Sequence, residues 1–160
     1  MKIEGNYTLP VPRDLAWQRL LDPQALARAL PGCEKFEPDP ADGSYRAELR
    51  VGIGQIKGTY HGRIEILEPV PPERYKLKIE GKGTGGFLKG EGTLALAESG
   101  AGTVVNYSGD VQVGGLIASV GQRLLLLAAK QIVNQFFEAF SKQFTTAPPG
   151  PAAAGPSSQS

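Results

Sequence analysis

Residues 116–144 read LIASVGQRLLLLAAKQIVNQFFEAFSKQF, and this stretch decides the fold. It contains no proline, and residues that favour helices dominate it. One helix of this length would reach roughly 40 Å, the width of a small domain. Residues 124–127 are four consecutive leucines, so apolar side chains occupy more than one side of the helix. Such a helix is usually buried, or contacts something besides its own core.

Two interpretations of this helix follow from its composition. Gln122, Arg123 and Lys130 interrupt the apolar residues, so no run of about 18 is left to span a membrane. The helix is therefore expected to lie across a sheet as a core helix. In the second interpretation, a ligand lies between the helix and that sheet.

Length and composition set the class of the protein. A chain of 160 residues indicates one domain. We assign it to residues 1–144, and residues 145–160, rich in Pro, Ala and Ser, to a flexible tail. A net charge of +1 with mixed signs gives no indication of nucleic-acid binding. The single cysteine excludes an internal disulfide, and no signal peptide precedes the first strand pattern, so a cytoplasmic protein is expected.

The rest of the chain alternates between apolar and polar residues in a way that predicts strands. The first strand covers residues 2–9, and two short helices follow, at 13–21 and from Asp22 to Leu30. Six more extended segments are expected at 33–37, 44–53, 55–68, 74–82, 87–97 and 103–113. Short connections favour an antiparallel meander. The predicted class is α+β, a curved antiparallel sheet of about seven strands wrapped on the long C-terminal helix.

Glycine is unusually frequent, with 21 of 160 residues, against about 7 per cent in average proteins. Several fall on the strand faces that should meet the helix, namely Gly58, Gly62, Gly81, Gly90, Gly92 and Gly109. They permit strong curvature and bulges. They also remove side-chain volume, which would leave a hollow for an apolar ligand. Both explanations stay open, and on the second we expect Gly92→Leu to abolish binding with a modest loss of stability.

The inward positions carry almost no ionisable group. By strand alternation, His61 lies on the outer side with Lys57 and Arg63, and Cys33 has no neighbouring ligand residue for a metal. No catalytic residue and no metal ligand is predicted. Residues 81–86 are glycine-rich but precede a strand, which does not fit a phosphate loop. We expect them to form a mobile flap at the mouth of the hollow.

Several stretches together resemble one family. They are ALPGCE (29–34), VGIGQIKG (51–58), GTGGF (83–87), GTVVNY (102–107), GGLIASVG (114–121) and NQFF (134–137). The chain resembles the G subunit of carbon monoxide dehydrogenase, within the START-like, or Bet v 1-like (SRPBCC), helix-grip superfamily. The resemblance implies an apolar cavity between sheet and helix, and a lipid-like ligand. It also implies an accessory role beside a molybdenum-containing CO dehydrogenase or a related hydroxylase, through membrane attachment or quinone carriage.

The sequence therefore predicts a non-enzymatic carrier of an apolar molecule, an isoprenoid quinone or similar lipid, with no cofactor of its own. The expected ligand-binding residues are Trp17, Leu30, Tyr60, Phe87, Tyr107, Leu116, Ile117, Val120 and Leu124. Gly58, Gly62, Gly90, Gly92 and Gly109 would form the pocket. The hydroxyl of Tyr60 or Tyr107 would donate to a carbonyl of the ligand.

Two rival functions remain. A small cyclase or hydrolase would need an ionisable group inside the pocket. An assembly or membrane-recruitment subunit would have a filled core and a docking surface made of the leucine run with Phe136, Phe137, Phe140 and Phe144. Members of the family often carry a longer hydrophobic or amphipathic C-terminal extension. Because residues 145–160 are small and polar here, we expect transient contact at the inner face of the membrane in place of stable anchoring.

Overall fold

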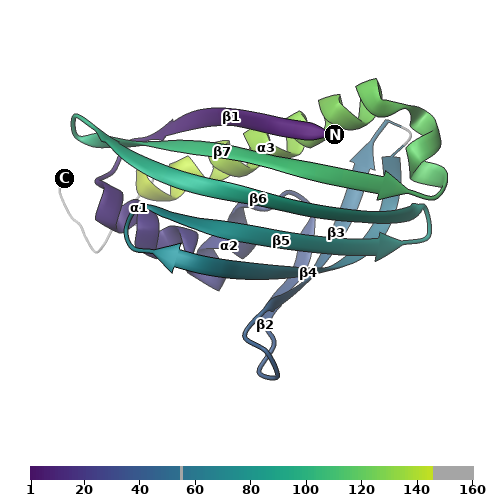
Figure 1. Cartoon of the computed structure of the whole chain (residues 1–160), viewed down its shortest axis with the longest axis horizontal. Coiled ribbons are helices and arrows are strands. Elements are labelled where there is room, and N and C mark those ends of the chain that lie inside the picture. The colour runs from purple at the N-terminus through teal and green to yellow at the C-terminus, as the bar shows by residue number, and fades with distance from the viewer. Residues whose placement is uncertain (55, 146–160) are drawn as a thin grey trace.

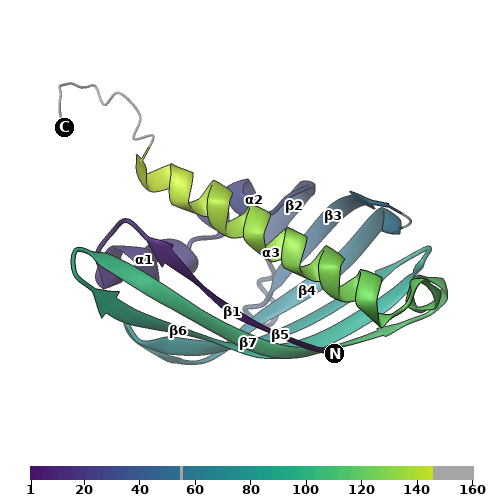
Figure 2. The ribbon, with the colours of Figure 1, turned by 90° about the horizontal axis from the view of Figure 1, so that it is seen from above.

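One antiparallel sheet curves around a long helix (Figures 1 and 2). The structure is a computed structural model that describes residues 1–54 and 56–145. The predicted tail at 145–160 lies outside the described residues, apart from its first residue, which ends the last helix.

The elements follow the order expected from the sequence. They are β1 (Lys2–Leu9), α1 (Arg13–Leu20), α2 (Pro23–Ala29), β2 (Cys33–Pro38), β3 (Tyr45–Ile53), β4 (Ile56–Val70), β5 (Arg74–Gly83), β6 (Gly86–Ser99), β7 (Gly102–Gly114), the 3₁₀ helix η1 (Leu116–Val120) and α3 (Gln122–Thr145). Asp22 caps α2 as predicted, because its Oδ1 accepts a hydrogen bond from the Gln24 N–H at 3.0 Å.

The sheet has the strand order β1-β7-β6-β5-β4-β3-β2, and every neighbouring pair is antiparallel. Strands β2 to β7 form the predicted meander, and β1 returns to pair with β7 at one edge (Figure 1). Tight hairpins, such as the one that brings Gly83 opposite Gly86, fix the register. Alternate residues of each strand therefore face the concave side, where α3 lies (Figure 2).

The long C-terminal helix begins later than the sequence predicts. Residues 116–120 form η1, and α3 starts only at Gln122. Gly121 separates the two because its φ of 96° lies outside the range that continues a helix. The Ile117 N–H donates to the Gly85 carbonyl at 2.7 Å, which ties η1 to the β5–β6 hairpin. The prediction of one uninterrupted helix over residues 116–144 is therefore wrong at its start.

The core is densely packed at the end of the molecule where α1 and α2 lie. Phe140 is fully buried, and Phe137 stacks on Tyr7 and on Tyr107, with ring centroids 5.3 and 5.6 Å away. The Gln143 Nε2 donates to the Ala25 carbonyl at 2.9 Å and joins α3 to α2. The predicted docking surface is therefore wrong in its aromatic part, because Phe137 and Phe140 belong to the core.

The opposite end of α3 is covered far less. Leu124 and Leu127 are 50% and 59% exposed, and Leu116 in η1 is 77% exposed. Among the described residues, no helix packs against them as α2 packs against the other end (Figure 2). The four-leucine run is therefore not fully buried, because two of its leucines face solvent at this incompletely covered end.

Candidate ligand-binding cavity

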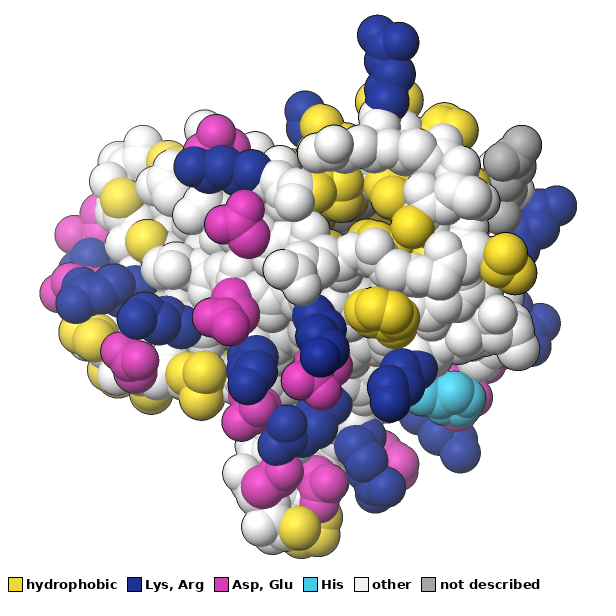
Figure 3. Space-filling model, turned by 45° about the vertical axis from the view of Figure 1, so that its right-hand side comes forward, with side chains coloured by type: hydrophobic (Ala, Val, Ile, Leu, Met, Phe, Trp, Pro, Cys, Tyr) yellow, Lys and Arg dark blue, Asp and Glu magenta, His cyan; other side chains and the backbone are white. Residues whose placement is uncertain are grey.

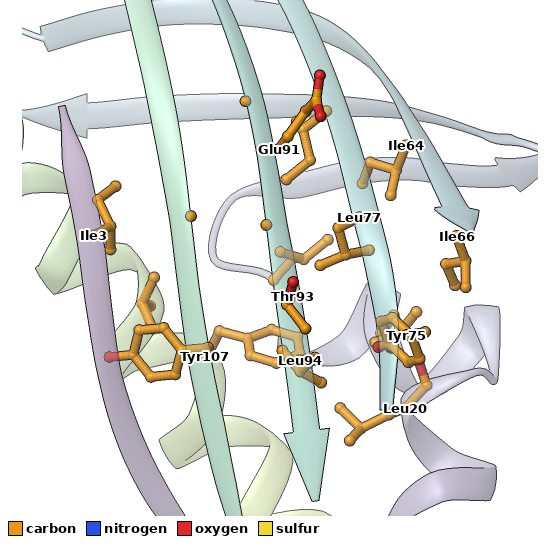
Figure 4. Close-up of a pocket in the computed structure, with 18 of the residues that line it drawn as sticks. Ile3, Leu20, Ile64, Ile66, Tyr75, Leu77, Glu91, Thr93, Leu94 and Tyr107 are labelled. Carbon is orange, nitrogen blue, oxygen red and sulfur yellow. Dashed lines mark hydrogen bonds between the residues drawn. The ribbon is translucent and has the colours of Figure 1, made fainter. Parts of the chain in front are cut away.

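A cavity of about 310 Å³ lies between the concave face of the sheet and α3 (Figure 4). Strand side chains that line it are Ile3, Phe36, Tyr45, Ile64, Ile66, Tyr75, Leu77, Ile79, Leu94, Tyr107 and Val111. Helix side chains that line it are Leu20, Leu26, Ile132, Val133, Phe136 and Phe137, and Leu30, which follows α2, lines it as well. The lining is almost wholly apolar, as in sites for lipid-like molecules.

The polar groups near the cavity are few. The Tyr75 hydroxyl donates to the Leu20 carbonyl at 3.2 Å, and burial, with a smaller contribution from Tyr45, raises the pKa of Tyr75. Tyr45 makes no hydrogen bond through its hydroxyl within the described part of the chain. Glu91 borders the cavity but is exposed, and strand alternation places its side chain on the face opposite to Gly90.

The glycines of β6 and β7 have two roles at once. Gly90, Gly92 and Gly109 line the floor of the cavity, and Gly92 pairs with Gly109 across the two strands. A Cβ on Gly92 would lie 2.7 Å from the Ser108 carbonyl oxygen, and one on Gly109 would lie 2.8 Å from the Glu91 carbonyl oxygen. The strand backbones therefore approach too closely for side chains here, and the same absence of side chains leaves the floor open.

This geometry changes one expectation about Gly92. Substitution by Leu would press its Cβ against strand backbone, so we now expect a larger loss of stability than the sequence suggested. Gly58 and Gly62 lie outside the lining. A Cβ on Gly62 would lie 3.0 Å from the Glu80 carbonyl oxygen, and Gly58 has a φ of 132°. Strand geometry accounts for these two glycines without a ligand.

Two of the predicted ligand-binding side chains, Leu30 and Tyr107, line the cavity. Tyr107 presents its ring, while its hydroxyl lies against β1 (Figure 4), 2.5 Å from where a Cβ on Gly5 would be. The hydroxyl therefore points away from the cavity. Trp17 lies in the core outside the lining, 5.6 Å between ring centroids from Tyr75.

The other predicted residues lie outside the lining, towards the open end of the molecule. They are Tyr60, Phe87, Leu116, Ile117, Val120 and Leu124. Tyr60 is buried against the β5–β6 hairpin, where Gly83 and Gly85 leave room for its ring and its hydroxyl. Phe87 lies over Gly114 and is 42% exposed. The ligand-binding role of these residues stays a prediction.

Several lining residues were missing from the predicted site. Tyr45, Ile64 and Leu77 were recognisable as inward-facing from strand alternation. Their position at the cavity could not be predicted, because alternation shows which face of a strand a residue lies on but not its distance from the helix that covers that face. Ile132 and Val133 were missed because nearly every side of the predicted helix is apolar.

The other reactive side chains lie apart from the cavity. His61 is exposed as predicted, with its Nδ1 3.3 Å from a Glu48 carboxylate oxygen. The Cys33 thiol donates to the Lys35 carbonyl, and burial raises the pKa of Cys33. In the part of the chain that the structure describes, no three or more His, Cys, Asp or Glu side chains are grouped as metal ligands would be. Nor does any described helix combine the length and hydrophobicity needed to cross a bilayer.

The cavity side of the molecule is hollowed at one end. Figure 3 brings forward the end that carries η1 and the β5–β6 hairpin. A hollow there has hydrophobic side chains inside it, and Lys and Arg side chains project around it. We call this end, built by η1, the β5–β6 hairpin and the start of α3, the mouth.

Comparisons with known proteins agree on family and fold. The sequence model of the G subunit of carbon monoxide dehydrogenase (CoxG) matches residues 5–145. A crystal structure of a conserved protein from Geobacillus kaustophilus is 32% identical, with a TM-score of 0.87, and the match covers 92% of this chain and 97% of that one. The comparison with curated protein sequences gave no match.

More distant structures share the architecture. A START superfamily protein from Mycobacterium smegmatis is 12% identical, with a TM-score of 0.69 over 91% of this chain and 97% of its own. TTHA0849 from Thermus thermophilus is 14% identical, with the same TM-score, over 92% and 99% of the two chains. The predicted START-like helix-grip fold is therefore confirmed.

Proposed function

The chain belongs to the CoxG family of carbon monoxide dehydrogenase subunits, and from this premise we propose that it binds and carries an apolar, lipid-like molecule without catalysing a reaction on it. The observation that carries the proposal is the cavity of about 310 Å³, lined by apolar side chains from both sheet and helix. Protein cores normally pack without such space, because an empty cavity lowers stability.

The proposed ligand is an isoprenoid quinone or a lipid of similar shape. Aromatic side chains on one wall suit a flat ring, since Phe36 and Tyr45 stack with centroids 5.2 Å apart. The Tyr45 hydroxyl, which has no partner among the described residues, would donate to a ring carbonyl. This replaces the predicted role of the Tyr107 hydroxyl, which points towards β1. The cavity volume, about 310 Å³, lies near the lower limit for ligand sites. A tail of several isoprene units is too large for it and would extend through the mouth.

The proposed partner is a molybdenum-containing CO dehydrogenase or a related hydroxylase. The support is the family itself, which is described as a subunit of CO dehydrogenase. In this role the chain would carry the quinone that accepts electrons from the enzyme. Co-purification of such a hydroxylase with the tagged chain tests the partnership separately from ligand binding.

Ligand binding can be tested with decylubiquinone, a short-chain quinone, followed by quenching of the single tryptophan. Trp17 contacts Tyr75, which lines the cavity, so a quinone inside should quench it. Leu77→Phe on β5 and Val133→Phe on α3 would fill the cavity from opposite walls. Leu67→Phe is the matched control, on the neighbouring strand outside the lining.

Wild type and the control should show saturable quenching. The two cavity-filling variants should bind at least about tenfold more weakly, a difference of about 1.4 kcal/mol, with unchanged melting temperatures. Equal affinity in all four proteins would place the ligand elsewhere. Absence of binding in the wild type would favour the rival assembly subunit.

A further inference from the structure

The cavity offers few side-chain hydroxyls to a ligand. Thr93 and Ser108 border it, but strand alternation places their side chains on the face opposite to the floor glycines of β6 and β7. The Tyr107 hydroxyl lies against β1. Among the lining residues that the structure describes, the hydroxyls of Tyr45 and Tyr75 are left. In so apolar a site, a ligand oxygen that meets the wrong hydrogen-bonding partner loses affinity.

Packing holds the Tyr75 ring in one position. The residue is 3% exposed, and the Trp17 ring lies against it, with centroids 5.6 Å apart. Leu94 is its partner on the neighbouring strand β6. Leu20 lies beside it at the cavity (Figure 4). Because the ring is enclosed on these sides, the place of its oxygen is fixed and does not follow the ligand.

The hydrogen of the Tyr75 hydroxyl is committed to the end of α1. It is donated to the Leu20 carbonyl, with 3.2 Å between the two oxygens, and both residues are buried. The two preceding carbonyls of this helix end accept backbone N–H groups from the residues that follow the helix. Turning the hydroxyl towards a ligand would leave the buried Leu20 carbonyl without this donor, and an unpaired buried carbonyl is destabilising.

Tyr75 can therefore offer a ligand only an acceptor. Burial raises the pKa of Tyr75, and Tyr45 adds to the shift, so the hydroxyl stays protonated at neutral pH. Its oxygen keeps a lone pair for a ligand O–H group, whereas a ligand carbonyl placed there would bring two lone pairs together. The Tyr45 hydroxyl, which is unpaired within the described residues, can turn either to donate or to accept.

We propose that Tyr75 makes the cavity selective for the reduced form of its ligand, whose ring carries two O–H groups where the oxidised quinone carries two carbonyls. One O–H of the quinol donates to the Tyr75 oxygen, and Tyr45 binds the other ring oxygen. The oxidised form binds through Tyr45 alone. A carrier with this preference holds the quinone more tightly after it has accepted electrons. The inference rests on the proposed function, because it takes the ligand to be a quinone.

Anaerobic calorimetric titrations with decylubiquinone and with decylubiquinol, its two-electron-reduced form, test the preference. The wild type should bind the quinol at least about tenfold more tightly than the quinone. Tighter binding of the reduced form raises the reduction potential of the bound pair. A redox titration should therefore place that potential about 30 mV or more above that of the free pair, which is the equivalent of tenfold for two electrons.

Tyr75→Phe removes the acceptor and keeps the ring. Its affinity for the quinol should fall about tenfold while its affinity for the quinone stays within about twofold, so the preference disappears. The melting temperature should fall as well, because Leu20 loses its donor, but a purely structural role would weaken binding of both forms alike. Tyr45→Phe should weaken both forms. Tyr60→Phe, a buried tyrosine outside the lining, is the matched control and should keep the preference.

The outcomes separate this selectivity from the carrier function. Equal affinities of the wild type for the two forms, or tighter binding of the quinone, would overturn the selectivity and leave the carrier function standing. A preference that survives in Tyr75→Phe would overturn the role of Tyr75. A wild type that binds neither form would refute the carrier function, and the selectivity with it.

Discussion

The two ends of α3 cover the same sheet in different ways. At the C-terminal end, α2 packs against the helix, and Phe140 is fully buried. At the N-terminal end, η1 precedes the helix and is tied to the β5–β6 hairpin, and Leu127 is 59% exposed. The packed end supplies the apolar contacts that hold the fold, which allows the mouth end to stay hollow and exposed.

The largest expected effect tests the packed end. Phe140→Ala should lower the free energy of unfolding by about 3–5 kcal/mol, because it opens a cavity among fully buried side chains. Leu127→Ala, on the same helix at the mouth end, should change it by less than about 0.5 kcal/mol. Urea denaturation measures both. Similar losses in the two variants would mean that the two ends contribute equally to stability.

A smaller effect is expected at the floor of the cavity. Gly92→Ala should cost about 1–3 kcal/mol, because the new Cβ would lie 2.7 Å from the Ser108 carbonyl oxygen. Gly52→Ala is the control, since no atom lies within 4 Å of a Cβ at that position. Thermal unfolding of both variants measures the difference. A neutral Gly92→Ala would show that the backbone approach is not what requires this glycine.

Tyr45→Phe tests the polar group on the cavity wall. Loss of one hydrogen bond to a ligand carbonyl should weaken decylubiquinone binding by about 0.5–1.5 kcal/mol, with unchanged stability. Tyr60→Phe, a buried tyrosine outside the lining, should leave the affinity as it is. Tryptophan quenching gives both constants. If the Tyr60 variant were the weaker binder, the head of the ligand would lie at the mouth and not at the inner wall.

The smallest effect lies in the loop between β2 and β3. Hydrogen bonds from the Ser44 hydroxyl and N–H, and the Arg63 guanidinium, lower the pKa of Asp42. A lowered folded-state pKa gives stability that is present above the unfolded value, about 3.9, and is lost as the pH falls below it. Asp42→Asn should therefore destabilise slightly at pH 6, and its difference from the wild type should shrink below pH 4. Quinone binding at pH 6 should not change.

Much of the fold was predictable from local sequence patterns. Alternation located six of the seven strands, the short segment at 33–37 was expected as extended, and Asp22 and Pro23 marked the start of α2. The break at Gly121 was not predictable, because a lone glycine is tolerated within a helix and only the observed φ shows that it ends one here. The part of the sheet that α3 covers was not predictable either, since it depends on how far the sheet curves.

The candidate site was less predictable than the fold. Three of the glycines expected at the pocket, Gly90, Gly92 and Gly109, line the floor of the cavity. Missing side chains are visible in a sequence. Aromatic residues were a poorer guide. Trp17 and Tyr60 are inward-facing and buried, yet other side chains pack against them and leave no space for a ligand. Cavity volume is a property of the whole packing and has no local signature.

The most direct test is a solvent extract of the purified protein analysed by mass spectrometry, with the Val133→Phe variant prepared in parallel. If the cavity carries an apolar ligand, the wild-type extract should contain a quinone or lipid in near-stoichiometric amount. The variant extract should contain far less of it. The same molecule in equal amounts in both extracts, or an empty wild-type protein that also fails to bind added decylubiquinone, would contradict the claim that the cavity is a ligand-binding site.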